Sequence, residues 1–329
     1  MAHFDVFNGD ADGLCALQQL RLASPREAVL VTGVKRDIAL LDRVHAHAGD
    51  TVTVLDVSLE RNREALLALL ARGVAVEYFD HHFAGTVPRH PLFTAHLDPA
   101  PEACTSLLVD RCLQGRHRAW AVVGAYGDGL PGTAEGLADR LGLTVDQRRT
   151  LRTLGEAINY NAYGETEADL LVPPARLAQL LRPYADPLVF AAASPEAREL
   201  AGARARDMAR AQAVPPSHEW PAAAVTFLPD APWARRVQGS FAHALGEREP
   251  ARAHAVLCER ADGSYSVSVR APRSRPQGAE SLCRRFPGGG GRAGAAGIDA
   301  LPAGRVDEFL QALAAAWPGT WQPSGREGD

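Results

Sequence analysis

The chain has 329 residues, 46% of them hydrophobic, so it is long and apolar enough to bury one large core or two ordinary ones. Its net charge of −4, without an obvious basic stripe, argues against a protein that coats long nucleic acid. The five cysteines are dispersed and form no CxxC pair, MAHFDVFNGD lacks the basic and apolar regions of a signal peptide, and no apolar run approaches the roughly 20 residues of a membrane span. We therefore expect a cytoplasmic, soluble protein with no membrane partner.

Strands and helices alternate along the first part of the chain. The hydrophobic pattern predicts strands at 3–8, 28–33, 51–57, 74–79 and 93–98. It predicts helices from Leu14, around Ile38 to Val44, from a cap at Ser58 to Gly73, and over 102–114. This order implies an α/β fold with a doubly wound, mostly parallel sheet. Lys35 is the only lysine among 35 basic residues, which we attribute to a compositional bias.

Acidic residues follow strand after strand. Asp10 and Asp12 follow the first strand, Asp56 ends the third, and Asp80-His81-His82 ends the fourth. Because the carboxyl ends of parallel strands meet at one edge of a sheet, these carboxylates would repel one another strongly. One or two bound cations would relieve this repulsion. Asp128, between glycines after an apolar stretch, brings a further acid, whereas Asp12 has the simpler alternative role of a helix N-cap.

The later part of the chain predicts a second, smaller α/β domain. Helices are expected at 133–142 and 145–160, and a polar helix starts at Ser194-Pro195. A strand at 222–228, a hairpin turn at Asp262-Gly263, an amphipathic stretch at 279–286 and a helix at 305–316 follow. We therefore expect domains at 1–186 and 215–318, a linker helix at 187–214 and a polar tail at 319–329.

A glycine run stands near the end of the second domain. Gly289, Gly291 and Gly294 fit G-x-G-x-x-G, but Pro287 and a helical pattern precede them, and no βαβ unit follows. This context argues against a dinucleotide site, and with it against a dehydrogenase. The run predicts a phosphate cradle instead, in which Gly289, Gly290 and Gly291 offer backbone N–H groups and Arg292 adds a charged contact. A flexible loop is the plain alternative.

Together these motifs resemble the DHH phosphoesterases. Asp10-Ala11-Asp12-Gly13 is similar to the first family motif, Asp56 in VLDVS to the second, Asp80-His81-His82 to the third and Asp128 in GAYGDG to the fourth. SVSVRA and AESLCRRFPGGGGRAGAAG resemble the associated substrate-binding domain, whose pattern is GGGHxxAAG. The resemblance spans about residues 5–297, in five ordered motifs.

The resemblance implies a role for each residue. Asp12, Asp56, His81 and Asp128 would hold one metal ion, and Asp10 and the bridging Asp56 would hold a second. His82 would face the substrate phosphate, and Arg270, Arg292 and the glycine run would hold the rest of the substrate. Manganese is the usual metal, with magnesium as the alternative. Members cleave phosphoester or phosphoanhydride bonds in short oligonucleotides, nucleotide bisphosphates, cyclic dinucleotides, single-stranded DNA or pyrophosphate. We therefore expect a metal-dependent hydrolase, an exonuclease among the options, whose substrate is a nucleotide or short single-stranded nucleic acid.

The chain departs from the family pattern in two places. A histidine usually precedes the first aspartate pair, but here the region reads DVFNG, with Val6 and Asn8. The second metal ion should therefore bind more weakly than the first and arrive with the substrate. Arg292 replaces the histidine of GGGHxxAAG, which changes how a phosphate is recognised. The rival hypothesis is a metal-poor relative that binds nucleotides or a partner without hydrolysis. The sequence leaves open which phosphoester is cut and which oligomer forms, a dimer included.

Overall fold

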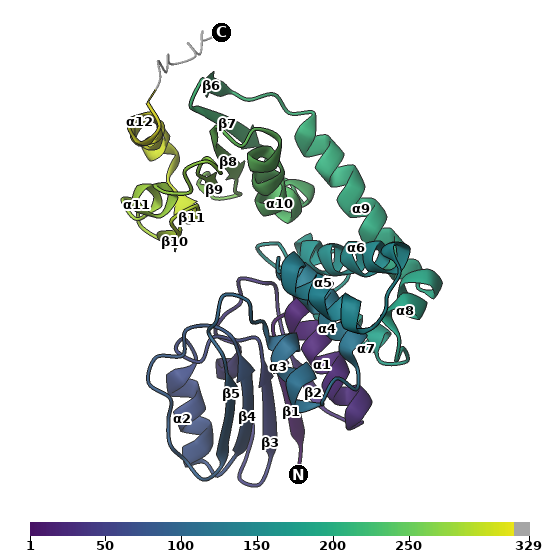
Figure 1. Cartoon of the computed structure of the whole chain (residues 1–329). Coiled ribbons are helices and arrows are strands. Elements are labelled where there is room, and N and C mark those ends of the chain that lie inside the picture. The colour runs from purple at the N-terminus through teal and green to yellow at the C-terminus, as the bar shows by residue number, and fades with distance from the viewer. Residues whose placement is uncertain (319–329) are drawn as a thin grey trace. The chain divides into compact units, whose positions relative to one another are not determined.

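The computed structural model describes residues 1–318 and divides into two compact units, Met1–Ala203 and a second that begins at Arg204 (Figure 1). Each unit has its own sheet and its own hydrophobic core. The division falls within the 187–214 range expected to be a linker, which forms two helices, α8 (Pro187–Ala193) and α9 (Pro195–Gln212). Phe190 and Leu200 from these helices belong to the core of the first unit. The expected polar tail, 319–329, lies outside the described residues.

The first unit is built on a parallel sheet of five strands in the order β2-β1-β3-β4-β5. The strands are β1 (His3–Phe7), β2 (Val29–Val31), β3 (Thr51–Leu55), β4 (Ala75–Asp80) and β5 (Phe93–Leu97). All neighbouring pairs are parallel, which confirms the predicted α/β sheet. The direction of winding reverses between β1 and β3. Ligands of such sheets bind beyond the strand ends at this switch point, and Asp10 and Asp56 follow the two strands concerned.

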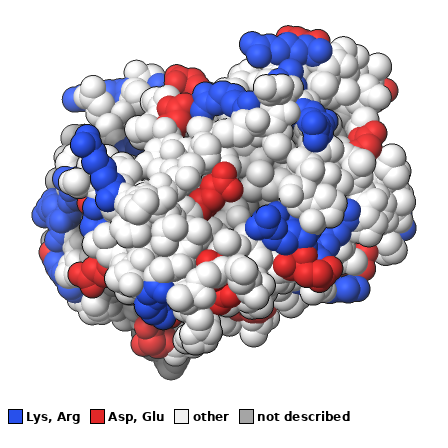
Figure 2. Space-filling view, turned by 90° about the horizontal axis from the view of Figure 1, so that it is seen from below, with Lys and Arg blue, Asp and Glu red and all other residues white. Residues whose placement is uncertain are grey.

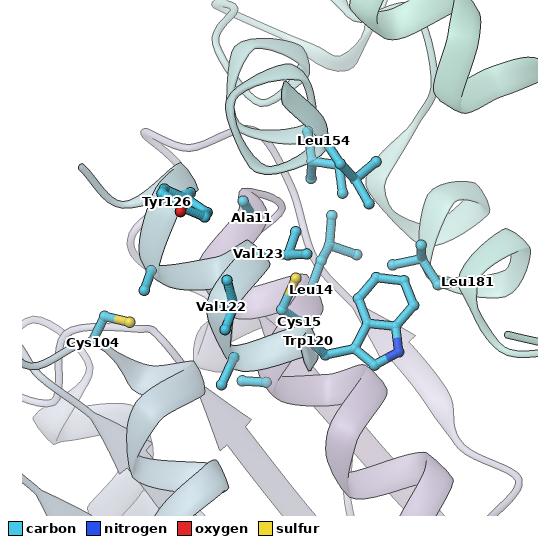
Figure 3. Packing of buried hydrophobic residues seen from close by; sticks show 14 of the residues in the cluster. Ala11, Leu14, Cys15, Cys104, Trp120, Val122, Val123, Tyr126, Leu154 and Leu181 are labelled. Atoms are coloured by element: carbon cyan, nitrogen blue, oxygen red, sulfur yellow. The ribbon is translucent and has the colours of Figure 1, made fainter. Parts of the chain in front are cut away.

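Helices cover both faces of this sheet. The helices of this unit before α8 are α1 (Ala11–Ala23), α2 (Arg63–Ala71), α3 (Thr105–Cys112), α4 (Arg118–Gly127), α5 (Pro131–Arg140), α6 (Val145–Asn161) and α7 (Pro174–Leu181), with a 3-10 turn at Glu167–Asp169. Of these, α1, α2 and α3 contact the strands, and α4 packs on α1. On one face, Leu14 and Cys15 of α1 pack with Trp120 and Val123 of α4 and Leu154 of α6 (Figure 3). On the other face, α2 buries its leucines against the side chains of β3 and β4. This core holds in place the N-terminus of α1, which follows Asp10, and the C-terminus of α4, which precedes Asp128.

The helix predicted around Ile38 and Val44 is wrong, because this segment forms only a 3-10 turn, Leu40–Arg43. The side chain of Asn62 explains the difference. Its Nδ2 donates to the carbonyl of Ile38 at 2.5 Å, and its Oδ1 accepts from the amide of Leu41 at 3.1 Å. The backbone groups are therefore satisfied without helical bonds. The helix predicted from Ser58 also begins later, at Arg63.

The second unit has a sheet of six strands in the order β10-β11-β9-β8-β7-β6. The strands are β6 (His218–Trp220), β7 (Ala223–Leu228), β8 (Ala253–Glu259), β9 (Tyr265–Arg270), β10 (Gly289–Arg292) and β11 (Ala295–Leu301). Only β7 and β8 pair in parallel among the described strands of this sheet. The hairpin predicted at Asp262-Gly263 is confirmed by the antiparallel pairing of β8 with β9. The helices are α10 (Pro232–Arg248), α11 (Ala279–Cys283) and α12 (Val306–Ala316), with a 3-10 turn at Ala303–Arg305.

The charged surface is mixed in sign. On the face shown in Figure 2, arginines stand among aspartates and glutamates. Among the ion pairs of the described residues, Arg148 pairs with both Glu135 and Asp139. Exposed pairs of this kind contribute about 0–1 kcal/mol each. Within residues 1–318, no helix combines the length and the apolar character that crossing a bilayer requires.

Candidate metal centre

The candidate ligands come from the ends of different elements. Asp10 caps the N-terminus of α1, Asp80 is the last residue of β4, and Asp128 caps the C-terminus of α4. Asp56 follows β3 with a φ of 58°, a left-handed conformation that costs a residue with a side chain on the order of 1–3 kcal/mol. Such backbone strain is typical of functional sites. Here it occurs at the residue expected to touch both metal ions.

The imidazole of His81 lies at the centre of the cluster. Its Nε2 is 3.4 Å from Oδ1 of Asp56, 3.9 Å from Oδ2 of Asp128 and 4.0 Å from Oδ2 of Asp12. Two ligands of one small divalent ion, each about 2.1 Å from it, lie roughly 3–4 Å apart. The ligand atoms of Asp12, His81 and Asp128 also lie within 4.8 Å of one another, as do those of Asp56, His81 and His82. Carboxylate oxygens around an imidazole nitrogen suit manganese or magnesium, so these residues fit a divalent cation.

Asp12 is held by the start of α3. Its Oδ2 accepts from the amide of Thr105 at 2.6 Å, and its Oδ1 accepts from the amide and the hydroxyl of Ser106 at 2.7 and 2.5 Å. A helix N-terminus favours an anion in this position. Thr105 also donates its hydroxyl to Asp56 at 3.4 Å. The sequence analysis did not identify either residue, because these contacts join Asp12 and Asp56 to residues far away in the sequence.

Asp80 acts on His82 and does not join the metal cluster. This buried carboxylate accepts from Nδ1 of His82 at 2.6 Å and from the backbone amide of Leu59 at 3.2 Å. Because an ionised carboxylate only accepts, Nδ1 carries the proton and Nε2 stays available for another partner. Burial acts to lower the pKa of His82, but the hydrogen bond and charge of Asp80 outweigh it, so this pKa is raised. His82 is therefore a fixed donor with 45% of its side chain exposed.

The carboxylates of the cluster disturb one another. Burial raises the pKa of Asp56 well above its usual range, and the charges of Asp10 and Asp12 raise it further. Burial and the charge of Asp12 raise the pKa of Asp128 to about 7. A cation placed among these groups would favour their ionised forms. The cluster therefore has the electrostatics as well as the geometry of a cation site.

Asp10 differs from the other acids because it already has a cationic partner. Its Oδ2 lies 2.5 Å from Nζ of Lys35, and its Oδ1 accepts from the amides of Asp12 and Gly13 at 2.9 and 3.1 Å. Burial acts to raise the pKa of Asp10, but the Lys35 ammonium outweighs it and holds this pKa below the usual range. Neither ligand group among the described residues includes Asp10. The structure thus brings Asp12, Asp56, His81, His82 and Asp128 together and ties Asp10 to Lys35.

The residues that stand where a histidine was expected have structural roles. Val6 is fully buried in β1. Asn8 accepts from the amide of Asp10 at 3.2 Å through Oδ1 and donates to the carbonyl of Lys35 at 3.4 Å through Nδ2. Asn8 therefore joins the loop of Asp10 to the loop of Lys35.

The predicted substrate residues of the second unit lie on two strands of its sheet, β9 and β10, with β11 between them. The glycine run forms β10, an edge strand paired with β11, and Arg292 is its exposed last residue. Gly291 has a φ of 142°, and a Cβ there would lie 2.5 Å from Cα of Ala296, so close packing alone requires glycine at this position. Arg270, at the end of β9, donates to the carbonyl of Val269 at 3.0 Å. The phosphate cradle stays a prediction.

Comparison with known proteins gives a likeness of fold. No family model matches the chain, and no curated protein sequence matches it. Three solved structures superpose on almost all of it. They are an exonuclease RecJ bound to manganese (TM-score 0.63, 19% identity, 96% of this chain and 90% of that chain), RecJ of Thermus thermophilus in complex with Mn²⁺ (0.59, 19%, 97% and 52%) and the pGpG-specific phosphodiesterase PggH of Vibrio cholerae (0.54, 15%, 96% and 98%).

The fold is therefore that of the DHH phosphoesterases, since RecJ and PggH are members of that family. This confirms the resemblance drawn from the motifs at the level of the fold. The chain spans about half the length of the Thermus RecJ, 52%, and nearly all of PggH, 98%.

Proposed function

We propose that this protein is a metal-dependent phosphoesterase that hydrolyses a phosphoester bond of a nucleotide or short oligonucleotide. The grouping of Asp12, Asp56 and Asp128 within 4.0 Å of Nε2 of His81 carries the proposal. The likeness of fold to RecJ and PggH, whose names describe an exonuclease and a dinucleotide phosphodiesterase, supports a nucleotide-type substrate. Manganese is the expected ion and magnesium the alternative.

Each residue has a defined task in this reaction. A bound divalent ion would lower the pKa of a coordinated water from about 15.7 towards about 7 and so supply hydroxide at neutral pH. In its protonated form, His82, oriented by Asp80, donates from Nε2 to a phosphoryl oxygen and stabilises the charge that develops there. Thr105 and Ser106 hold the carboxylates of Asp56 and Asp12 in place. Arg270 and Arg292 bind a second phosphate or a terminal nucleotide of the substrate.

The alternative is a relative that binds nucleotides or a partner without hydrolysing them. The observation in its favour is the loss of one expected ligand, since Val6 is buried in β1 and Asn8 bonds within the loops. A cytoplasmic location is proposed with either function, because all five cysteines are free thiols, as in a reducing compartment.

A substrate screen tests the function. Short RNAs and DNAs, cyclic dinucleotides and 3′,5′-bisphosphates are incubated with the protein and manganese, and free nucleotide or phosphate is measured. Hydrolysis that disappears with a chelator and returns with manganese is the expected result. Tight binding of a nucleotide without turnover, in the presence of manganese, would favour the alternative.

A further inference from the structure

Lys35 lies in the loop after β2, and three groups surround its ammonium. Nζ is 2.5 Å from Oδ2 of Asp10 and 3.2 Å from Oδ1 of Asn159 on α6, and it lies over the ring of Tyr163, 5.5 Å from the centroid. The backbone is fixed too, because the Lys35 amide donates to the carbonyl of Ala162 at 2.9 Å and its carbonyl accepts from Asn8. The side chain is 28% exposed, so the position is both well defined and open to a ligand.

The metal ligands converge on a single nitrogen. Nε2 of His81 lies within 4.0 Å of a carboxylate oxygen of Asp12, Asp56 and Asp128. Both groups of candidate metal ligands contain His81. An imidazole nitrogen has one lone pair and therefore binds one metal ion. Nδ1 of His82, the other ring nitrogen near Asp56, is taken by Asp80 at 2.6 Å. The two ligand groups therefore meet at Nε2 of His81 and describe one ion at that nitrogen.

One divalent metal ion and one lysine offset three of the four negative charges at the centre. Asp12, Asp56 and Asp128 bring three negative charges to the ion, and Asp10 brings a fourth that Lys35 neutralises. Both oxygens of Asp10 are already used, Oδ1 by two backbone amides and Oδ2 by the ammonium. A second divalent ion bound by Asp10 would have to displace the Lys35 ammonium from Oδ2. The two positive charges of this ion would then repel the ammonium at short distance.

We propose that the ammonium of Lys35 takes the place of a second metal ion, so that the centre works with one divalent ion and one built-in cation. This inference rests on the proposed phosphoesterase function. The ammonium has three N–H groups, of which Asp10 and Asn159 use two. The third binds a non-bridging oxygen of the substrate phosphate. A lysine suits this task because it is a compact charge whose three donors reach three partners in different directions.

The number of manganese ions bound without substrate tests the inference. The number of manganese ions bound per chain at equilibrium is measured for the wild-type protein and for three variants. The variants are Lys35→Gln, Lys35→Arg and the double variant Lys35→Gln with Asp10→Asn. We expect one ion in wild type and in Lys35→Arg, which keeps the positive charge. Lys35→Gln should bind two ions, because the freed carboxylate of Asp10 becomes a ligand. The double variant should return to one, which places the extra ion at Asp10.

Two ions bound to the wild-type protein would overturn the inference, and so would a folded Lys35→Gln variant that binds only one. Circular dichroism shows whether each variant is folded, and two ions in the wild-type protein would overturn the inference even if Lys35→Gln does not fold. The ion count is independent of turnover. A wild-type protein that binds one ion and hydrolyses nothing in the screen would remove the proposed function and leave the assignment of Lys35 as a structural cation.

Discussion

Asp56→Asn is the most direct test of the candidate metal centre, because Asp56 provides the carboxylate nearest to the shared nitrogen of His81, at 3.4 Å. Asparagine is a better choice than alanine here. Asp56 has a φ of 58°, a conformation that asparagine tolerates and that strains an alanine. The substitution therefore removes the negative charge and leaves the shape of the loop intact.

The expected loss of activity follows from the role of the carboxylate. Loss of an outer group that only orients a metal ligand costs about 10–100-fold. Loss of an ionised ligand should cost at least about 100-fold, or about 2.7 kcal/mol of transition-state free energy. The assay is kcat/KM with manganese on the best substrate of the screen. Asp146→Asn is the matched control, because this carboxylate on α6 is 85% exposed and should change nothing.

The same variant has an expected effect on stability. A carboxyl group whose pKa is raised on folding binds more protons in the folded state, so its contribution to stability falls as the pH rises through the two pKa values. At neutral pH, Asp56 therefore destabilises the metal-free protein, and Asp56→Asn should unfold at the same temperature or higher after chelation. Activity within tenfold of wild type, in a variant that unfolds normally, would refute the assignment of Asp56 as a ligand.

Four further changes test other parts of the site. Arg292→Ala should raise KM about 10–100-fold and leave the bound manganese unchanged, because a charge-assisted phosphate contact contributes about 1.5–3 kcal/mol. Asp80→Asn should lower kcat about 10–100-fold at an unchanged ion count, since it loosens the 2.6 Å contact that orients His82. Ser106→Ala removes a hydroxyl donor to Asp12 and should weaken manganese binding about tenfold, as measured by a binding titration. Chelation of the wild-type protein should abolish hydrolysis, and added manganese should restore it in a turnover assay.

These outcomes separate the roles from one another. An unchanged KM in Arg292→Ala would mean that β10 is an ordinary edge strand, whose glycines serve close packing alone. A loss of bound manganese in Asp80→Asn would make this residue part of the metal site, contrary to its contacts with His82 and Leu59. Unaltered manganese affinity in Ser106→Ala would leave the two backbone amides of α3 as sufficient support for Asp12.

The parallel sheet and the meeting of its acidic strand ends were predictable from the sequence. Alternation of strands and helices decides which strand ends share an edge, so Asp12, Asp56 and His81 were expected together before any distance was known. Asp128 was expected from its motif, but its position depends on the packing of α4 on α1. Gly127 makes that packing possible, because a Cβ there would lie 2.3 Å from Cβ of Ala11.

The contacts that complete the site were not predictable, since they join residues far apart in the sequence. Ser106 meets Asp12 across 94 positions, and Asn159 meets Lys35 across 124. No local pattern encodes such a distance. The missing helix near Ile38 has a similar origin, because the side chain of Asn62 satisfies backbone groups that a periodicity argument assigns to helical bonds.

Lys35 shows how a compositional observation acquires meaning from the structure. Every other one of the 35 basic residues is arginine, and a bias of that kind explains an arginine at any exposed position. It does not explain the single lysine. Around Nζ stand a carboxylate, an amide oxygen and the face of a phenol ring, an arrangement that suits a small charge with diverging donors better than the planar fork of a guanidinium. A lysine that is kept at position 35 despite this bias indicates that the chemistry of an ammonium is needed there, beside the carboxylates of the proposed metal centre.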